Sequence, residues 1–242
     1  MPTPTFFALG EERRARLVSE AIREFSERSY AEASLSQIAL RSHIAKGSFY
    51  QYFADKLDLY RWLVTDEAPR RKREFIGSSV AEAGDFWVGF EALIERGLAF
   101  LVEHPRLARL TAAAADPAAS AEVRGLHQAI CEAGIAELRA QLQRGIACGA
   151  IQSPDLDIGV ATRLVAAIVG PGLTDVVLQE LKAELHEVLA SDSLRKRLGP
   201  TRRTRLARQA VLLIRSGLQP LVNQPKRRVK AVPSRKTSRK TR

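Results

Sequence analysis

The chain has 242 residues, of which 45% are hydrophobic, 27% are charged and only 6% are aromatic. Ala, Leu, Glu and Arg dominate, and β-branched runs with period two are missing, so the composition predicts an all-α fold. Nine of the eleven net positive charges lie in residues 226–242, which carry no acidic residue. The rest of the chain is almost neutral, which excludes nucleic-acid binding through a bulk basic surface.

Targeting and redox features predict a cytoplasmic protein without a membrane segment. The first residues lack a basic stretch leading into an apolar one, so we expect no signal peptide. The most apolar run, residues 164–173, is too short to cross a bilayer and contains a Gly-Pro-Gly sequence. Cys131 and Cys148 lie within one expected helix, about 25 Å apart, which is too far for a disulfide.

The first 62 residues predict a small three-helix domain. Residues 1–9 contain no Lys or Arg and are expected to form an arm. A helix is expected over residues 11–28, where Val18, Ile22 and Phe25 recur at helical spacing. Glutamates at its start suit the positive end of the helix dipole. This helix would pack against the two that follow.

Residues 34–56 predict two short helices, over 35–42 and 46–52, joined by a tight turn. Ser34 is a suitable N-cap for the first helix. The expected buried side chains are Leu35, Ile38, Ala39, Phe49 and Phe53. The expected outward positions are polar or cationic, namely Ser36, Gln37, Arg41, Lys46, Ser48, Tyr50 and Gln51. A helix with this mixture fits the major groove of DNA.

The same stretch resembles the DNA-binding domain of the TetR/AcrR family of repressors. The resemblance covers roughly the first quarter of the chain and is carried by Ile38-Ala39, Lys46-Gly47-Ser48-Phe49-Tyr50-Gln51-Tyr52-Phe53, Lys56 and Leu59. His43 stands where the family usually has the turn glycine, and Ala45 where it usually has the capping serine. His tolerates left-handed backbone, and a lost cap costs about 0.5–2 kcal/mol, so we expect the motif to survive both changes.

Ten residues are predicted to contact DNA: Ser34, Ser36, Gln37, Arg41, Lys46, Gly47, Ser48, Tyr50, Gln51 and Lys56. Tyr50 and Lys56 are expected to hold phosphates, while Gln37, Lys46 and Gln51 are the expected base readers. Without the corner between the two helices, the same side chains would be an ordinary polar helix surface.

For two of these residues, Gly47 and Lys56, there is a specific physical reason to expect contact with DNA. Gly47 would let the backbone come close to a sugar-phosphate strand. Lys56 follows Asp55, the expected cap of a fourth helix, with Asp58 placed as in a capping box. A cation in the first turn opposes the helix dipole, and a DNA phosphate at that helix end would resolve the conflict.

Residues 63–225 predict a helical bundle. Pro69 should kink or restart the fourth helix because proline removes a hydrogen-bond donor. Further helices are expected over 85–103 and 107–115, with a stop at Asp116-Pro117, and then over 119–149. The next helix is expected to start at Asp155 or Asp157 and to reach about 185, with a break or bend at Gly170-Pro171-Gly172. A basic loop at 191–205 and a last helix over 204–218 follow. Residues 226–242 lack apolar periodicity and predict a disordered basic tail.

The family resemblance implies that the last two long helices pair with those of a second copy, giving a homodimer. It also implies that a small molecule enters the bundle, and the residues around 47–60 are similar to members that sense fatty acyl compounds. Predicted contacts for such an apolar effector are Phe90, Phe100, Leu126, His127 and Ile130. An aromatic stripe at this spacing is more often plain core.

The sequence does not support an enzymatic function, and we expect neither a cofactor nor a metal. His43, His104, His127 and His186 show no metal-ligand spacing with one another or with a cysteine. A nucleophile elbow and a phosphate-binding glycine loop are also missing.

The sequence thus predicts a helix-turn-helix domain over 1–62, a ligand-binding and dimerisation bundle over 63–225, and a basic tail over 226–242. The predicted function is a homodimeric transcriptional repressor that reads a near-palindromic operator on double-stranded DNA and is released by a small apolar ligand. An alternative interpretation is a DNA-binding protein of the same fold without an inducer, such as a structural regulator of the nucleoid.

Overall fold

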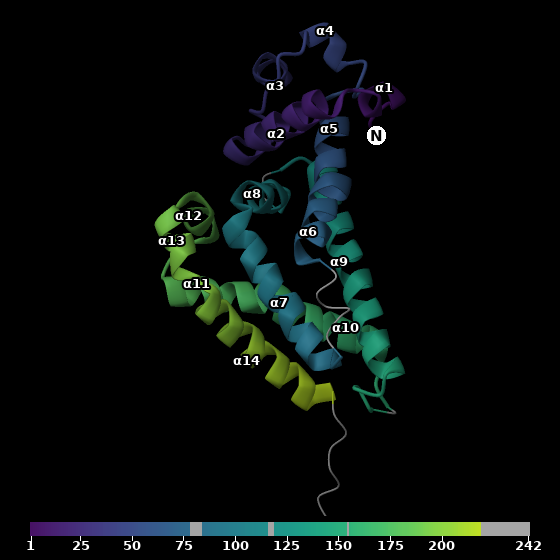
Figure 1. Ribbon diagram of the computed structural model, residues 1–242, viewed down its shortest axis with the longest axis vertical. Coiled ribbons are helices and arrows are strands. Elements are labelled where there is room, and N and C mark those ends of the chain that lie inside the picture. The colour runs from purple at the N-terminus through teal and green to yellow at the C-terminus, as the bar shows by residue number, and fades with distance from the viewer. Residues whose placement is uncertain (78–83, 116–118, 154, 219–242) are drawn as a thin grey trace, which may run out of the picture.

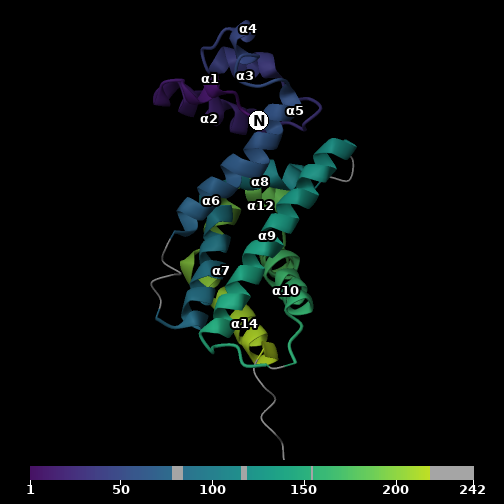
Figure 2. The same cartoon turned by 90° about the vertical axis from the view of Figure 1, so that its right-hand side faces the viewer.

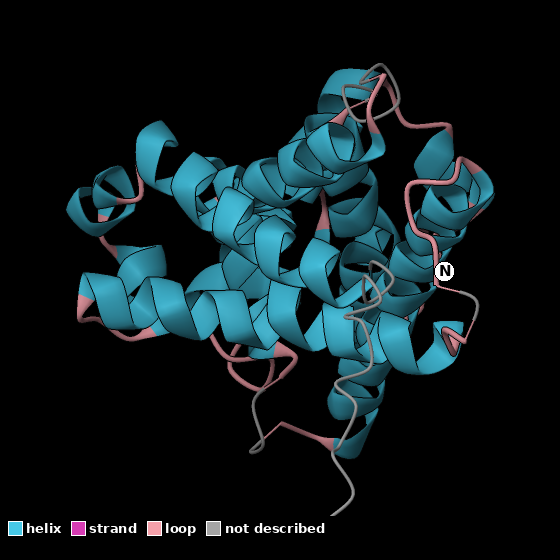
Figure 3. Cartoon of the chain, turned by 90° about the horizontal axis from the view of Figure 1, so that it is seen from below, coloured by secondary structure: helices cyan, strands magenta, loops and turns pink. Residues whose placement is uncertain are grey.

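The computed structural model describes residues 1–77, 84–115, 119–153 and 155–218. These residues form helices joined by short connections and contain no strand (Figure 3), which confirms the predicted all-α class. The amino-terminal helices form a small domain at one end of the molecule, and the remaining helices form a bundle below it (Figure 1). The basic tail predicted over 226–242 lies outside the described residues.

The amino-terminal domain contains α1 (Pro4–Phe7), α2 (Glu11–Glu27), α3 (Leu35–Arg41) and α4 (Lys46–Phe49). The first expected helix and both expected stripes of buried residues are confirmed. They meet in one core whose members include Leu17, Val18, Ile22, Phe25, Ile38, Phe49 and Phe53.

The prediction of an arm over residues 1–9 is wrong, because this segment folds onto the domain. Thr3 caps α1 through its side chain, and its amide donates to the carbonyl of Tyr52 at 3.0 Å. Phe6 is fully buried, with its ring centroid 5.0 Å from that of Phe53 and 5.1 Å from that of Trp62. Burial of this one aromatic side chain holds the segment in place.

A single helical rod connects the domain to the bundle (Figure 2). It consists of α5 (Lys56–Trp62), the π-helical turn η1 (Leu63–Glu67) and α6 (Ala68–Ile76), in which Pro69 lies in the first turn. Proline has no N–H and its ring clashes with the carbonyl four residues earlier, so the wider turn lies just before it. The expected restart of the helix at Pro69 is confirmed.

Glu67 at the end of η1 is buried, yet it is paired. Its carboxylate accepts from Arg70 at 2.8 Å and from Arg71 at 2.7 Å. Burial by itself would raise the pKa of Glu67, but the two guanidinium groups outweigh it and keep the pKa below its ordinary value. Part of the basic run after Pro69 therefore neutralises this carboxylate.

The bundle contains α7 (Phe86–Glu103), α8 (Pro105–Ala113), α9 (Ala121–Ala147), α10 (Ile158–Ala167), η3 (Ile168–Gly172), α11 (Leu173–Leu181), α12 (Leu185–Ala190), α13 (Asp192–Arg197) and α14 (Pro200–Leu218). Of the two aspartates that were candidates to start α10, Asp157 caps it. A second core joins α7, α9, α10, α11 and α14 through Trp87, Phe90, Leu142, Val165, Val177 and Ile214. The helix stop expected at residues 116 and 117 lies outside the described residues.

The Gly-Pro-Gly sequence does not end its helix. Residues 168–172 form the π turn η3, and the helix continues from Ile158 to Leu181. This 24-residue helix is long and apolar enough to cross a membrane by length and composition, unlike the shorter run that we expected. One such helix is weak support for a membrane span, and its inner side belongs to the second core.

The basic loop predicted over residues 191–205 is also wrong. Lys182 adopts a left-handed conformation, with φ of 52°, and ends α11. The chain then forms α12 and α13 before α14 begins at Pro200. Two arginines of the predicted loop form ion pairs with neighbouring helices. Arg203 contacts Glu95 of α7 at 2.8 Å, and Arg205 contacts Glu180 of α11 at 2.5 Å.

Candidate nucleic-acid interface

The corner between α3 and α4 forms as the sequence predicted. The hydroxyl of Ser34 accepts from the amide of Gln37 at 3.4 Å and caps α3. His43 takes up the left-handed turn, with φ of 56°, and Ala45 provides no side-chain cap for α4. The second helix is shorter than expected, since it ends at Phe49 and the chain turns through Tyr50.

A polar face of the corner is exposed and free of internal partners. Ser36, Gln37, Lys46, Tyr50 and Gln51 are exposed, and Ser48 is half-buried. Among the described residues, the side chains of Gln37, Lys46 and Tyr50 accept or donate no hydrogen bond and form no ion pair. We call Ser36, Gln37, Lys46, Gly47, Ser48, Tyr50 and Gln51 the exposed polar face.

Gly47 is not required by packing within the chain. A Cβ atom added to it would meet no atom within 4 Å, and its backbone does not lie in the left-handed region. A glycine that the protein itself does not need is compatible with close approach of an outside group to the backbone.

Arg41 does not face outward as predicted. Its guanidinium forms an ion pair with Glu24, a residue only 1% exposed, and lies 3.1 Å from Glu20. Burial would raise the pKa of Glu24, but the Ser34 amide and Arg41 outweigh this effect and lower it. The long side chain of Arg41 reaches the carboxylate on α2, so its charge stabilises the packing of α3 on α2.

Lys56 is also placed differently from the prediction. Its ammonium donates to the carbonyls of Ala31 and Ala33, each at 3.1 Å, and lies 4.7 Å from the centre of the Tyr30 ring. The conflict between this cation and the dipole of α5 is therefore offset inside the domain. Asp55 caps α5 as expected, with its carboxylate accepting from the Asp58 amide at 2.7 Å.

Four of the five residues predicted to contact an effector are divided between two cores. Phe100, Leu126 and Ile130 belong to the core that continues into the amino-terminal domain, whereas Phe90 belongs to the second core. His127 is half-buried on α9, one turn from the exposed Cys131. The prediction grouped these residues by helix period, which does not distinguish two adjoining cores.

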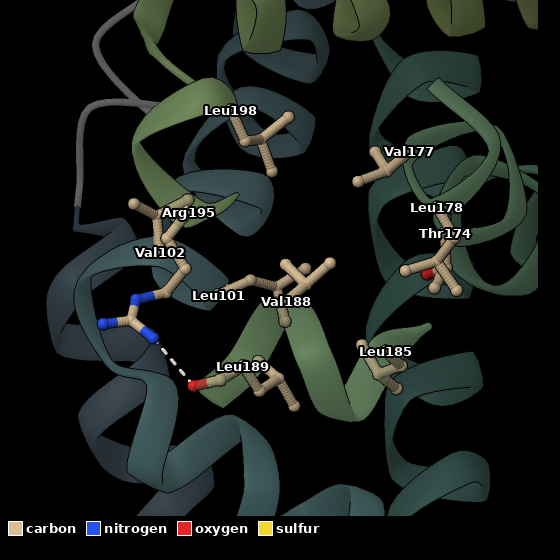
Figure 4. Close-up of a pocket in the computed structure, with 10 residues that line it drawn as sticks. All are labelled: Leu101, Val102, Thr174, Val177, Leu178, Leu185, Val188, Leu189, Arg195 and Leu198. Carbon is tan, nitrogen blue, oxygen red and sulfur yellow. Dashed lines mark hydrogen bonds between the residues drawn. The ribbon is translucent and has the colours of Figure 1, made fainter. Parts of the chain in front are cut away.

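An enclosed cavity lies elsewhere, between α7, α11, α12 and α13 (Figure 4). Its volume is about 10 Å³, close to the space that one water molecule needs. Apart from Thr174 and Arg195, its lining is aliphatic, and Arg195 donates outward to the carbonyl of Leu189 at 2.7 Å. A molecule larger than water could enter this cavity only if these helices separated.

Apolar side chains are exposed on α10, α11 and α14 of the bundle. Val160 and Leu164 of α10, Val176 of α11, and Leu212 and Leu213 of α14 are each at least 41% exposed. The ion pair between Arg205 and Glu180 holds α14 beside α11. We call these five residues the exposed apolar face.

One histidine and one cysteine, which we had not singled out as a metal-ligand spacing, lie beside each other. His127 and Cys131 are four residues apart on α9, and their Nε2 and Sγ atoms are 3.5 Å apart. The residues that the structure describes contain no group of three or more metal-ligating side chains. The spacing of four was available in the sequence and was the pattern that could have revealed this pair.

Residues 17–62 match the family described as bacterial regulatory proteins, tetR family. The HTH-type transcriptional regulator HbdR of Aromatoleum sp. (strain CIB) is 43% identical over 51 residues. The uncharacterized HTH-type transcriptional regulator YdgC of Bacillus subtilis (strain 168) is 39% identical over 57 residues. These matches span 21% and 24% of the chain, and only 22% and 29% of the two relatives, so they concern the amino-terminal region.

Solved structures match over most of the chain. A TetR family transcriptional regulator from Chloroflexus aurantiacus J-10-FL is 32% identical, with a TM-score of 0.61, over 90% of this chain and 98% of that one. The regulator FadR from Bacillus subtilis, solved in complex with stearoyl-CoA, is 19% identical with a TM-score of 0.62, over 85% of this chain and 99% of that one. The first likeness extends to sequence, while the second shows the fold alone.

Proposed function

Because the chain belongs to the TetR family of transcriptional regulators, we propose that it is a homodimeric repressor that reads a near-palindromic operator and is released by a small apolar effector. The observation that carries this proposal is the exposed polar face at the corner of α3 and α4. Its side chains are free to bind, and their amides, hydroxyls and cation suit base edges and phosphates. The protein would act in the cytoplasm, on chromosomal DNA.

Within this face we assign the roles by chemistry. Gln37, Lys46 and Gln51 are the proposed base readers, and the hydroxyl of Tyr50 is the proposed phosphate contact. Ser34, Arg41 and Lys56, which the sequence also pointed to, hold the domain together through the contacts described above. Their effect on DNA binding would be to position the corner. Lys56 donates two of its three ammonium hydrogens to the carbonyls of Ala31 and Ala33, so the third would be available to a phosphate.

Dimerisation is proposed through the exposed apolar face. Isolated apolar side chains on a surface are ordinary, and the proposal is that these five, on α10, α11 and α14, are covered by a second copy. A symmetric pairing of α10–α11 and α14 with their mates would hold two recognition corners together. Half-sites about 34–36 Å apart would then fall in successive major grooves.

The proposed effector acts on the contact between the bundle and α5. Phe100, Leu126 and Ile130 pack in the same core as Tyr60 and Leu63 of the rod. An apolar molecule that inserts there would displace the rod and change the separation of the two corners. It can shift the equilibrium only as far as its affinities for the two arrangements differ. The stearoyl-CoA bound to the Bacillus subtilis FadR makes long-chain acyl compounds the first to test.

The test is a mobility-shift titration with DNA from upstream of the protein's own gene, in the presence of excess random DNA. A retarded complex that contains two chains and persists as salt is raised supports the proposal. Gln37→Ala should cost about 1–3 kcal/mol on the preferred sequence and relax preference at one base pair. Absence of any preference over random DNA would contradict it.

Lys46→Ala has a matched control in Arg139→Ala. Both substitutions remove one exposed positive charge, but Arg139 lies on α9 in the bundle. Lys46→Ala should weaken binding to the operator, whereas Arg139→Ala should leave it unchanged. Equal losses would indicate that only net charge matters.

The alternative, a DNA-binding protein without an inducer, is in line with the small volume of the cavity between α7, α11, α12 and α13. A thermal-shift series with acyl compounds of increasing chain length separates the two functions. Stabilisation together with release of DNA favours the inducible repressor. Operator binding with no response to any compound in the series favours the alternative.

A further inference from the structure

The pair formed by His127 and Cys131 lies apart from the exposed polar face and the exposed apolar face. The two residues are one turn apart on α9, and the Cys131 sulfur is 3.5 Å from Nε2 of His127. Cys131 is exposed, and a Cβ added at Gly134, one turn further along, would meet nothing within 4 Å. The space beside the pair is open to a small ion and its water.

The separation of the two atoms fits a chelate. Zinc binds thiolate sulfur at about 2.3 Å and imidazole nitrogen at about 2.0–2.1 Å, and a tetrahedral angle then places the two ligand atoms roughly 3.5 Å apart. Thiolate and imidazole favour Zn²⁺ and softer ions over Mg²⁺ and Ca²⁺, which prefer oxygen. Both ligand atoms already lie at chelating distance, so binding would not require α9 to move.

We propose that His127 and Cys131 form a bidentate site for a soft or borderline metal ion of the Zn²⁺ and Cd²⁺ class. On binding, the Cys131 thiol releases its proton to solvent, and His127 binds through Nε2 while Nδ1 keeps the ring proton. Water molecules complete the coordination. Two protein ligands make an exchangeable site, in contrast to the four ligands of structural zinc sites.

The site lies on a part of α9 that contacts the rod. Leu126 and Ile130, which flank His127 and Cys131 in sequence, pack into the core that contains Tyr60 and Leu63. A bound ion fixes the side chains of one helical turn at this contact. The site is separate from the apolar effector proposed above and does not depend on it.

The first experiment is a Cd²⁺ titration of the reduced full-length chain, followed by the ultraviolet absorption of cadmium–thiolate bonds. The unaltered chain and Cys148→Ser should each bind one Cd²⁺ per chain. His127→Ala should bind about tenfold or more weakly, because one of two protein bonds is lost. Cys131→Ser should show no absorption band, and Mg²⁺ should not compete.

Three outcomes would overturn the site. His127→Ala could titrate like the unaltered chain, which would mean that the thiolate binds alone. The band could survive in Cys131→Ser, or it could disappear in Cys148→Ser. Circular dichroism of each variant shows whether it is folded before it is compared.

A second measurement needs no variant. Both cysteines are free and exposed, so each should react with iodoacetamide in the metal-free chain. Zn²⁺ should slow alkylation of Cys131 much more than that of Cys148, as read from the masses of the peptides that contain them. Equal protection of the two cysteines would contradict the proposal.

Discussion

The hydroxyl of Tyr60 donates a hydrogen bond to the backbone carbonyl of Leu110 at 3.2 Å, joining α5 of the rod to α8 of the bundle. The ring of Tyr60 lies 5.0 Å from that of Phe25 and 5.2 Å from that of Tyr30, centroid to centroid. Tyr30 in turn contacts the ammonium of Lys56. A continuous set of contacts therefore connects α8 of the bundle to the residues that precede α3.

Tyr60→Phe tests the hydrogen bond without removing the ring. The substitution leaves a buried carbonyl without this donor, so it should lower the free energy of unfolding by about 1–3 kcal/mol. Urea denaturation gives this value. Tyr50→Phe is the matched control, because Tyr50 is 55% exposed and its hydroxyl has no partner among the described residues. Its effect should stay within about 0.5 kcal/mol.

Tyr60 should also ionise well above the ordinary pKa of a tyrosine. Burial, followed by the nearby Tyr30, raises the pKa of Tyr60 to about 12. The folded pKa lies above the ordinary value of 10.0, so the neutral form contributes stability that is present below pH 10 and lost as the pH rises towards 12. Spectrophotometric titration should show a late step that is absent from Tyr60→Phe. Ionisation of all tyrosines together near pH 10 would contradict this.

Phe6→Ala should destabilise the amino-terminal domain by about 3–5 kcal/mol, the usual cost of removing a buried aromatic ring. The neighbouring Phe7 is 56% exposed and provides the control. Phe7→Ala should change the free energy of unfolding far less. Thermal denaturation of the two variants makes the comparison, and equal effects would mean that α1 does not pack as described.

Arg41→Ala should lower stability by about 1.5–3 kcal/mol, because it removes the closer of two charged partners of the buried Glu24 and leaves only the exposed Arg28, at 3.6 Å. Arg23→Ala removes two surface pairs within α2, to Glu20 and Glu27, and should cost at most about 1 kcal/mol. The pKa of Glu24 is lowered from 4.5, so its contribution is present above that pH and lost as the pH falls below it. Denaturation at pH 7 and at pH 3 should show a smaller difference in Arg41→Ala than in the unaltered chain.

Leu213→Glu should produce a monomer if the exposed apolar face is the dimer interface. A buried carboxylate in an apolar interface has no partner there and opposes association. Sedimentation velocity measures the change in mass. Leu40→Glu is the control, because Leu40 is 69% exposed but lies on α3 of the amino-terminal domain. A dimer that persists in Leu213→Glu would place the interface elsewhere.

The corner of α3 and α4 could be predicted because its determinants are local. Ile38, Phe49 and Phe53 recur at spacings that define a buried side, and Ser34 caps the helix that follows it. Histidine at position 43, where the family usually has glycine, could also be accommodated locally, because histidine tolerates the left-handed backbone that the turn needs. Where the arrangement of a side chain depends on residues close to it in the chain, the sequence is enough to predict it.

Contacts between distant residues could not be predicted in the same way. Phe6 is apolar in either an arm or a packed helix, and only the pocket beside Phe53 and Trp62 decides between them. Arg41 and Lys56 have long side chains that can reach solvent or an internal acceptor. These acceptors are Glu24 on α2 and the carbonyls of Ala31 and Ala33 before α3. The helical spacing that identified the buried faces gives no information about which side chain reaches them.

The π turn η1 also bears on how the rod tolerates a change of length. A π turn closes its hydrogen bond over one more residue than an α turn, so the extra residue is taken up within the turn. Deleting one residue between Leu63 and Glu67 would return the rod to regular α-helix and leave its two ends nearly in phase. Related chains that are one residue shorter here would thus carry the amino-terminal helices in nearly the same direction.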